Sequence, residues 1–238
     1  MATAVSGLPE RVPIHIHVSE QPRENTECLA AHGLTPTAVL DRAGALSDRT
    51  TIIHATHLTG GDIAMIAASD TVVSLCPTTE ADLGDGIARV KDLQDAGVRM
   101  AIGTDEDVIT DPFTELRMLE STARLVTGTR GIIGCEALWK IGTRNGVESL
   151  RPAAEPLPRQ TSTPGPGSAG LAAGDPADIA VVEPSSARLA GVDPTRWPLV
   201  ATANDVAATI VAGEWNRLDA AVAEDLRHVL DELRGRDS

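Results

Sequence analysis

The stretch that decides the fold is Pro13-Ile-His-Ile-His-Val18, which is followed directly by Ser19-Glu20. A short run rich in β-branched residues is typical of a strand. Three later apolar runs have the same character, and the segments between the four runs are long enough for helices. Strands that alternate with helices predict βα units and a parallel sheet. The expected strands cover residues 13–18, 51–54, 71–75 and 98–102, and the expected helices cover 24–31, 37–43, 61–68, 87–96, 112–125 and 135–144.

The amino-acid composition of the chain changes after residue 150. Residues 151–169 contain five prolines with interspersed Gly and Ser, which is typical of a linker or an extended crossing segment. Short strands are expected at 178–182 and 208–211, and an amphipathic helix at 218–233. We therefore divide the chain into an α/β unit (1–150), a small β module (151–216) and a C-terminal helix (217–238).

Composition excludes several classes of function. The 238 residues include 20 Lys and Arg against 34 Asp and Glu, a formal net charge of −14, and such a chain repels phosphate backbones. Only four aromatic side chains are present, too few to stack single-stranded nucleic acid. No apolar run reaches the roughly 20 residues of a membrane helix, and the N-terminus does not resemble a signal peptide. The three cysteines are odd in number and far apart in the sequence, which argues against a set of disulfides. We expect a cytoplasmic protein with no nucleic-acid or membrane partner.

Polar side chains follow three of the expected strands. His15 and His17 are two residues apart and share one face of the first strand, with Glu20 just beyond it. The second strand ends in His54, with His57 close behind, and the fourth is followed by Gly103-Thr-Asp105. The carboxyl ends of parallel strands are where α/β folds place active sites. These side chains are therefore expected to meet in one site.

Imidazole and carboxylate are ordinary zinc ligands, and zinc lowers the pKa of a bound water to about 7. Glu20 is placed to shuttle protons, and His54 to orient or deprotonate that water. Other candidates favour structural explanations. His32 and His228 lie on expected helices without a partner pattern, the cysteines are expected to pack in the interior, and the acidic residues near Asp111 and Glu115 are expected to form a solvated helix start.

Three motifs carry a resemblance to a known family: His17-Val-Ser-Glu20, Ile53-His-Ala-Thr-His-Leu58 and Gly103-Thr-Asp105. They resemble the fifth, sixth and eighth strand ends of the metal-dependent amidohydrolase superfamily, in its deaminase branch. The stretch 15–21 and the loop Cys76-Pro-Thr-Thr-Glu-Ala-Asp-Leu-Gly-Asp-Gly86 look more specifically like formimidoylglutamate deiminases. Residues 170–182 resemble the small β-sandwich that follows the barrel. The expected fold is then a partial TIM (β/α) barrel made of its last four strands, plus a β-sandwich-like segment.

The resemblance also implies roles for individual residues. His17 and Asp105 would bind one divalent metal, usually zinc. Asp105 would also accept a proton from the attacking water, His54 would polarise that water, and Glu20 would protonate the imine nitrogen. His15 and Gln21 would lie near the small-molecule substrate. Formimidoyl-L-glutamate would be converted to N-formyl-L-glutamate and ammonia, a step of histidine degradation.

The chain departs from the family pattern in two respects. The family's first strand supplies a further His-x-His ligand pair, and here only about a dozen residues precede the fifth-strand motif; Glu106-Asp107 also adds negative charge beside Asp105. We therefore expect a truncated deaminase that is inactive alone and oligomeric or aggregation-prone, and that acts with the other half or in a homo-oligomer. Two alternatives stay open: a non-catalytic remnant that binds metal or a partner, and a small metallohydrolase that uses His15 with His17.

Overall fold

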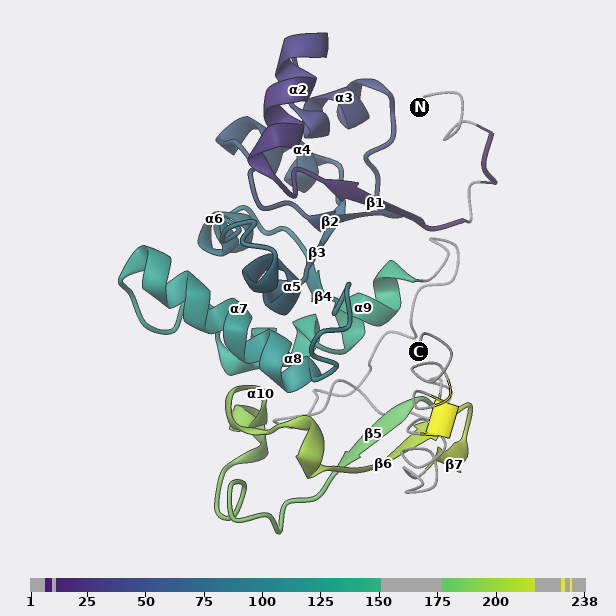
Figure 1. Ribbon diagram of the computed structural model, residues 1–238, viewed down its shortest axis with the longest axis vertical. Helices are drawn as coiled ribbons and strands as arrows, with labels where there is room; N and C mark the ends of the chain where they lie inside the picture. The colour runs from purple at the N-terminus through teal and green to yellow at the C-terminus, as the bar shows by residue number, and fades with distance from the viewer. Residues whose placement is uncertain (1–6, 10–11, 151–176, 217–227, 230–231, 233–238) are drawn as a thin grey trace.

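The computed structural model describes residues 7–9, 12–150, 177–216, 228–229 and 232. Within these ranges no helix is both long and apolar enough to cross a membrane. Two sheets organise the chain (Figure 1): a parallel sheet of strands β1 to β4 and an antiparallel sheet of strands β5 to β7.

The parallel sheet confirms the four predicted strands. They are β1 (Ile14–Val18), β2 (Thr50–His54), β3 (Val72–Leu75) and β4 (Met100–Ile102), and they pair in sequence order. The register pairs His17 with Ile53 and Ser74 with Ala101, so these residues lie side by side on neighbouring strands. The strand ends that carry the candidate site residues therefore all lie at the same edge of the sheet.

The sheet has two chemically different faces. One face packs its aliphatic side chains against the helices, and Ile52, Val73 and Leu75 on it are completely buried. The opposite face borders a cavity of 280 Å³ that His15, His17, Ile53, Ser74 and Ala101 help to line. The hydrophobic core thus holds one face rigidly, and polar groups on the other are free to serve a site.

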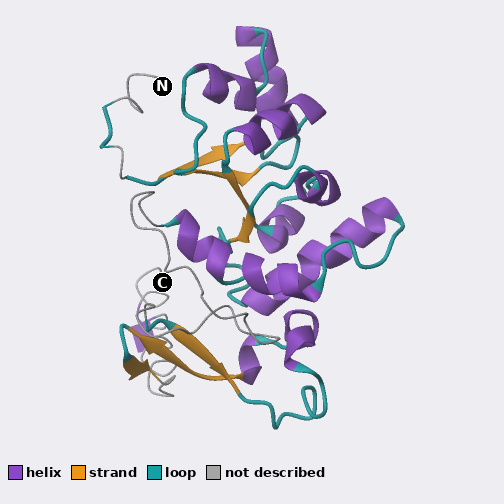
Figure 2. Ribbon diagram, turned by 180° about the vertical axis from the view of Figure 1, so that it is seen from behind, coloured by secondary structure: helices purple, strands orange, loops and turns teal. Residues whose placement is uncertain are grey.

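Figure 2 shows that most helices gather on one side of the parallel sheet. Sequence signals set their ends: Pro22 begins α2 and Gly33 ends it in the left-handed region (φ 67°), while Thr59 and Asp62 form a capping box at the start of α4. The helices of this unit are α2 (Pro22–His32), α3 (Pro36–Arg42), α4 (Gly60–Ala68), α5 (Pro77–Asp82), α6 (Val90–Asp95), α7 (Pro112–Thr127), α8 (Cys135–Ile141) and α9 (Arg144–Ser149).

The structure corrects the sequence prediction in three places. The stretch 76–86, expected to be a loop, contains the helix α5. The expected helix 135–144 ends at Ile141, and a second helix, α9, begins at Arg144. Glu115, expected at a solvated helix start, is fully buried because its carboxylate accepts hydrogen bonds from the backbone and hydroxyl of Thr78 on α5.

The C-terminal unit is smaller than a sandwich in the part that the structure describes. Residues 177–216 form one antiparallel sheet of β5 (Ile179–Val182), β6 (Val206–Val211) and β7 (Glu214–Asn216), with no second sheet packed on it among them. The third strand, β7, was not predicted. Between β5 and β6 lie the 3-10 helix η1 (Pro194–Arg196), α10 (Trp197–Val200) and the 3-10 helix η2 (Ala203–Asp205). The expected helix 218–233 falls almost entirely outside the described residues.

This unit is attached to α7 and α8. The Arg117 guanidinium on α7 donates to the carbonyl oxygens of Leu199 (3.0 Å) and Ala201 (2.6 Å). Phe113, also on α7, packs in a small apolar cluster with Leu189 and Ala201. Among residues 177–216, no side chain belongs to the group formed by His17, His54 and Asp105 or lines the cavity beside it.

Candidate active site

The backbone turns sharply where the strands end. Ser19 (φ 54°), His54 (φ 69°), Ala55 (φ 52°) and Asp105 (φ 53°) all adopt the left-handed conformation. This conformation is uncommon for residues other than glycine, and it is typical of sites where surrounding contacts hold the chain in place. Here the restraints include hydrogen bonds from Ala55 N to Val18 O and from His57 N to Ser19 O, each 3.0 Å.

These turns bring three potential metal ligands together. One ligand atom from each of His17, His54 and Asp105 lies within 4.8 Å of the other two. The imidazole rings of His17 and His54 meet edge to face, with centroids 4.9 Å apart and an interplanar angle of 88°. The structure thus brings together the three side chains that were expected to meet, while their roles as ligands or catalytic groups stay a prediction.

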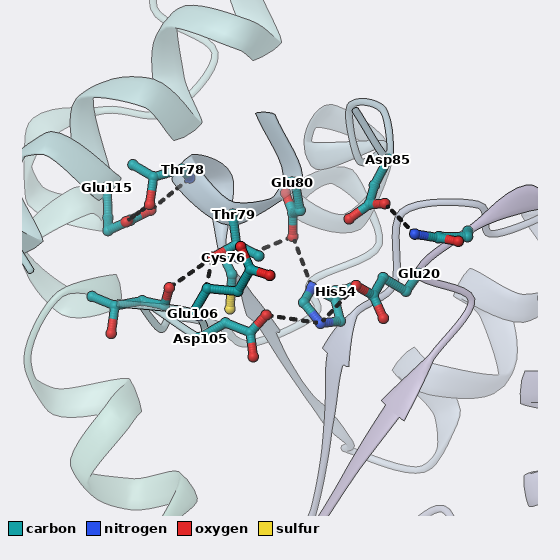
Figure 3. A network of polar contacts seen from close by, with 12 residues as sticks. Glu20, His54, Cys76, Thr78, Thr79, Glu80, Asp85, Asp105, Glu106 and Glu115 are labelled. Atoms are coloured by element: carbon teal, nitrogen blue, oxygen red, sulfur yellow. Dashed lines mark hydrogen bonds and ion pairs between the residues drawn. The ribbon is translucent and has the colours of Figure 1, made fainter. Parts of the chain in front are cut away.

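His54 lies at the centre of the site, with carboxylates around its ring (Figure 3). Its Nε2 is 3.8 Å from Glu20 Oε1 and 3.9 Å from Asp105 Oδ2, while its Nδ1 is 3.5 Å from Glu80 Oε1. Burial by itself lowers the pKa of His54, but Glu80, Glu20 and Asp105 together outweigh it and leave the pKa raised. The imidazole is thus held in a strongly negative environment.

Glu20 is half-buried beside this ring. Burial raises its pKa above the usual 4.5, and this outweighs the opposing effect of His54; Asp85 and Asp105 raise it further, while His17 lowers it. A carboxyl group with a raised pKa is suited to carry a proton at the site and to release it to a substrate atom.

The donor set fits a zinc-type ion. Two imidazoles and a carboxylate are ligands that zinc accepts, and both ring nitrogens of His54 are buried without a hydrogen-bond partner in the described part of the chain. Buried polar atoms are otherwise almost always satisfied. The unsatisfied nitrogen that faces Asp105 is therefore consistent with a site that takes a further group.

The remaining predicted residues lie around this centre. His15 lines the cavity beside His17, but it is outside the ligand group, and its Nε2 donates to Ser149 O at 3.0 Å. Gln21 donates to Asp85 Oδ1 at 3.0 Å. His57 is also outside the ligand group, because its Nε2 donates to Asp85 O at 2.8 Å. A ligand set that uses His15 together with His17 is thus not formed.

Helix α5 contributes residues that the sequence prediction missed. Thr79 Oγ1 donates to Thr104 O at 2.7 Å and so fixes the loop that carries Asp105. Glu80, 5% exposed, faces His54. One signal could have found this helix: Pro77, two residues after the last residue of β3, with Glu80 in the first turn, is the pattern of a helix start.

Comparison with known proteins assigns the family. Residues 10–151, which contain the whole parallel sheet and the site, match the model of the amidohydrolase family. The chain belongs to the amidohydrolase family. The resemblance predicted from the strand-end motifs is thereby confirmed.

Individual relatives extend the match over nearly the whole chain. It is 32% identical to formimidoylglutamate deiminase from Pseudomonas aeruginosa over 99% of this chain and 50% of the relative. It is 29% identical to 5-methylthioadenosine/S-adenosylhomocysteine deaminase from Halobacterium salinarum over 94% of this chain and 52% of that protein. This amidohydrolase chain therefore spans about half the length of the curated relatives it matches.

Solved structures agree with this assignment. An amidohydrolase from Brucella melitensis superposes with a TM-score of 0.76 at 27% identity, over 90% of this chain and 46% of that one. An adenosine deaminase from Xanthomonas campestris with bound zinc superposes with a TM-score of 0.73 at 24% identity, over 94% of this chain and 51% of that one. The second similarity shows that the two chains share a mixed α/β fold with a parallel sheet.

Proposed function

We propose that this chain carries part of the catalytic centre of a zinc-dependent hydrolytic deaminase that acts on formimidoyl-L-glutamate. The observation that carries the proposal is the meeting of His17, His54 and Asp105 within 4.8 Å, with Glu20 beside them. The 32% identity to a formimidoylglutamate deiminase supports the amidine substrate over the thioadenosine substrates of other relatives.

The residues divide the proton transfers between them. A divalent ion held by His17 and Asp105 would supply Lewis acidity and lower the pKa of a water molecule. His54 Nε2 and Asp105 Oδ2 lie 3.9 Å apart, and together they would accept the proton that water loses as it adds to the formimidoyl carbon. Glu20 donates a proton to the imine nitrogen. The imine nitrogen thereby becomes the amino group of a tetrahedral adduct. The proton taken from water would then pass to this amino group, and the hydroxyl proton of the adduct would return to Glu20. The carbon–nitrogen bond breaks as the carbonyl forms, which releases ammonia and leaves the N-formyl product.

The ligand set needs further members. A catalytic zinc site usually has three protein ligands and one open position, and this chain supplies His17 and Asp105 beside the catalytic His54. We place the remaining ligands in a segment that corresponds to the other half of an amidohydrolase barrel, or in a second copy of this chain. Either one could also pair with the edge strands of the described sheet, which are β1 and β4.

A complementation assay tests this proposal. The full chain is mixed, with zinc, with the segment of the Pseudomonas deiminase that precedes the matched region, and ammonia release from formimidoyl-L-glutamate is measured. We expect activity only in the mixture, and a loss of about 100-fold or more for Glu20→Gln, within the range that general acid catalysis contributes. His32→Gln, at an exposed position on α2, serves as the matched control and should change nothing.

The outcomes separate the candidate functions. No ammonia from a stoichiometric complex that binds zinc would refute the deaminase proposal and favour a non-catalytic module. Ammonia release from 5-methylthioadenosine in place of formimidoyl-L-glutamate would retain the reaction class and replace the substrate. Turnover by the chain alone, as a monomer, would contradict the need for a partner.

A further inference from the structure

Glu80 connects the start of helix α5 to the ring of His54. A single oxygen, Oε1, accepts a hydrogen bond from Cys76 N at 2.9 Å and lies 3.5 Å from His54 Nδ1. Glu80 is 5% exposed and His54 is completely buried, so solvent screens the interaction between the two side chains only weakly. Figure 3 shows this carboxylate on the opposite side of the ring from Asp105.

The two sides of the His54 ring differ in how firmly their carboxylates are held. Glu80 is fixed at its own backbone, where its N–H donates to Cys76 O at 2.9 Å, and at its carboxylate by Cys76 N. On the other side, Glu20 and Asp105 lie 3.8 Å and 3.9 Å from Nε2, and both carboxylate side chains are partly exposed. Among the three carboxylates described around this ring, Glu80 on the Nδ1 side is the one whose oxygen is fixed by a backbone hydrogen bond.

The chemistry of imidazole gives this asymmetry a consequence. A neutral ring carries one N–H and one acceptor nitrogen, and the hydrogen bond made by one nitrogen decides which of them keeps the proton. Glu80 Oε1 is 3.5 Å from Nδ1, too long for a well-formed hydrogen bond, but its negative charge, held in place at this distance, attracts a proton to Nδ1 and so favours the Nδ1–H form. Nε2 is then left as the acceptor toward Glu20 and Asp105, which is the state that a proton acceptor at this site needs.

We propose that Glu80 is a positioning residue that holds His54 as the Nδ1–H tautomer, with Nε2 directed at the reaction centre. The inference rests on the proposed function for its purpose, since it concerns the residue that receives the proton from water. It does not depend on the substrate. The competing explanation is that Glu80 serves only to cap α5.

Glu115 provides the matched control for that competing explanation. It is also a buried carboxylate that accepts a hydrogen bond from the first turn of α5, from Thr78 N at 3.1 Å, and in the described part of the chain it makes no hydrogen bond or ion pair with His54. Loss of Glu115 should therefore weaken the start of α5 much as loss of Glu80 does. Only loss of Glu80 should change the ring of His54.

The test is nitrogen NMR of the full chain after treatment with a chelator. Long-range proton–nitrogen correlation spectra report the tautomer of each neutral imidazole, and His54→Asn assigns the signal. We expect the Nδ1–H form in the wild type, a shift toward the Nε2–H form in Glu80→Ala, and no shift in Glu115→Ala. Glu80→Gln should restore the wild-type tautomer, because its amide oxygen still accepts a hydrogen bond.

Several results would overturn the proposal. An Nε2–H tautomer in the wild type does so without any variant, even where Glu80→Ala fails to fold. An unchanged tautomer in folded Glu80→Ala, or an equal shift in Glu115→Ala, does so as well.

In the complemented enzyme we expect Glu80→Ala to lower kcat by about 10- to 100-fold, as loss of residues that orient a functional side chain does in other proteins. Because the spectra need neither metal nor substrate, an inactive complex would refute the deaminase proposal and leave this inference standing.

Discussion

The pair formed by Thr78 and Glu115 holds helix α5 against α7, and replacing Thr78 with Val tests how much it stabilises the fold. Thr78 is 4% exposed, and its hydroxyl donates to a carboxylate that is completely buried. The substitution removes the hydroxyl and nearly conserves the volume, so the lost interaction dominates. A hydrogen bond to a charged group contributes about 1.5–3 kcal/mol, and we expect the free energy of unfolding to fall by that amount.

The cost of Thr78→Val should depend on pH. Burial raises the pKa of Glu115 above 4.5, and the two hydrogen bonds from Thr78 oppose that rise. Because the folded pKa exceeds the unfolded one, ionisation of Glu115 destabilises the native state as pH rises from 4.5 through the folded pKa. Removing the hydroxyl raises the folded pKa further. The full cost therefore appears above that pKa and becomes small below 4.5.

Urea unfolding followed by far-ultraviolet circular dichroism measures this cost at acidic pH and in mildly alkaline buffer. Thr26→Val removes a hydroxyl from the exposed face of α2 and should change stability by less than about 0.5 kcal/mol. In a double-mutant cycle with Glu115→Gln, we expect a coupling energy within the about 0.5–3 kcal/mol found for residues in contact. A cost below about 0.5 kcal/mol in alkaline buffer, or one that is equal at both pH values, would refute the reasoning.

Three further predictions concern other parts of the chain. Gly142→Ala places a Cβ 2.8 Å from Cδ1 of buried Leu116, and such overpacking destabilises the folded chain by about 1–3 kcal/mol. This cost should exceed the about 0.4–1 kcal/mol by which alanine stabilises a protein through the lower entropy of its unfolded chain. A urea midpoint above that of the wild type would contradict this expectation. Hydrogen bonds, first that from Ser186, lower the pKa of Asp205 from 3.8 to about 2. Asp205→Asn should therefore destabilise the chain above pH 3.8, with the difference from wild type disappearing as pH falls through about 2; a pH-independent difference in urea titrations would count against it. His17→Gln should lower the zinc affinity of the chelator-treated chain by more than about tenfold, because loss of a residue that merely hydrogen-bonds to a metal ligand already lowers affinity by that factor. An unchanged affinity in calorimetry would exclude His17 as a ligand.

The sequence predicts the sheet well because two strong signals coincide there. Aliphatic and β-branched runs mark β1 to β4, and the polar residues that end them stand out against their apolar neighbours. Parallel strands bring such ends to one edge whatever the intervening helices do. His17, His54 and Asp105 could therefore be placed together without knowledge of any contact between them.

Helix α5 shows where this reasoning stops. It has six residues, two of them threonines, and such a short segment is not stable as an isolated helix. Its stability depends on Glu115, which lies 37 residues later than Thr78 in the sequence. The burial of Glu115 and the approach of Glu80 to His54 follow from that tertiary contact, and neither leaves a periodic pattern in the sequence.

The left-handed turns at the strand ends narrow the choice of amino acids there independently of chemistry. Histidine and aspartate adopt the left-handed conformation more readily than most other residues. His54 and Asp105 therefore meet the backbone requirement of these turns as well as the chemical requirement of the site. A β-branched replacement at either position would distort the main chain and displace neighbouring groups. Asparagine shares the backbone preference, which makes it the informative substitute: inactivity of an Asn variant can be attributed to the lost functional group, whereas inactivity of a Val variant cannot.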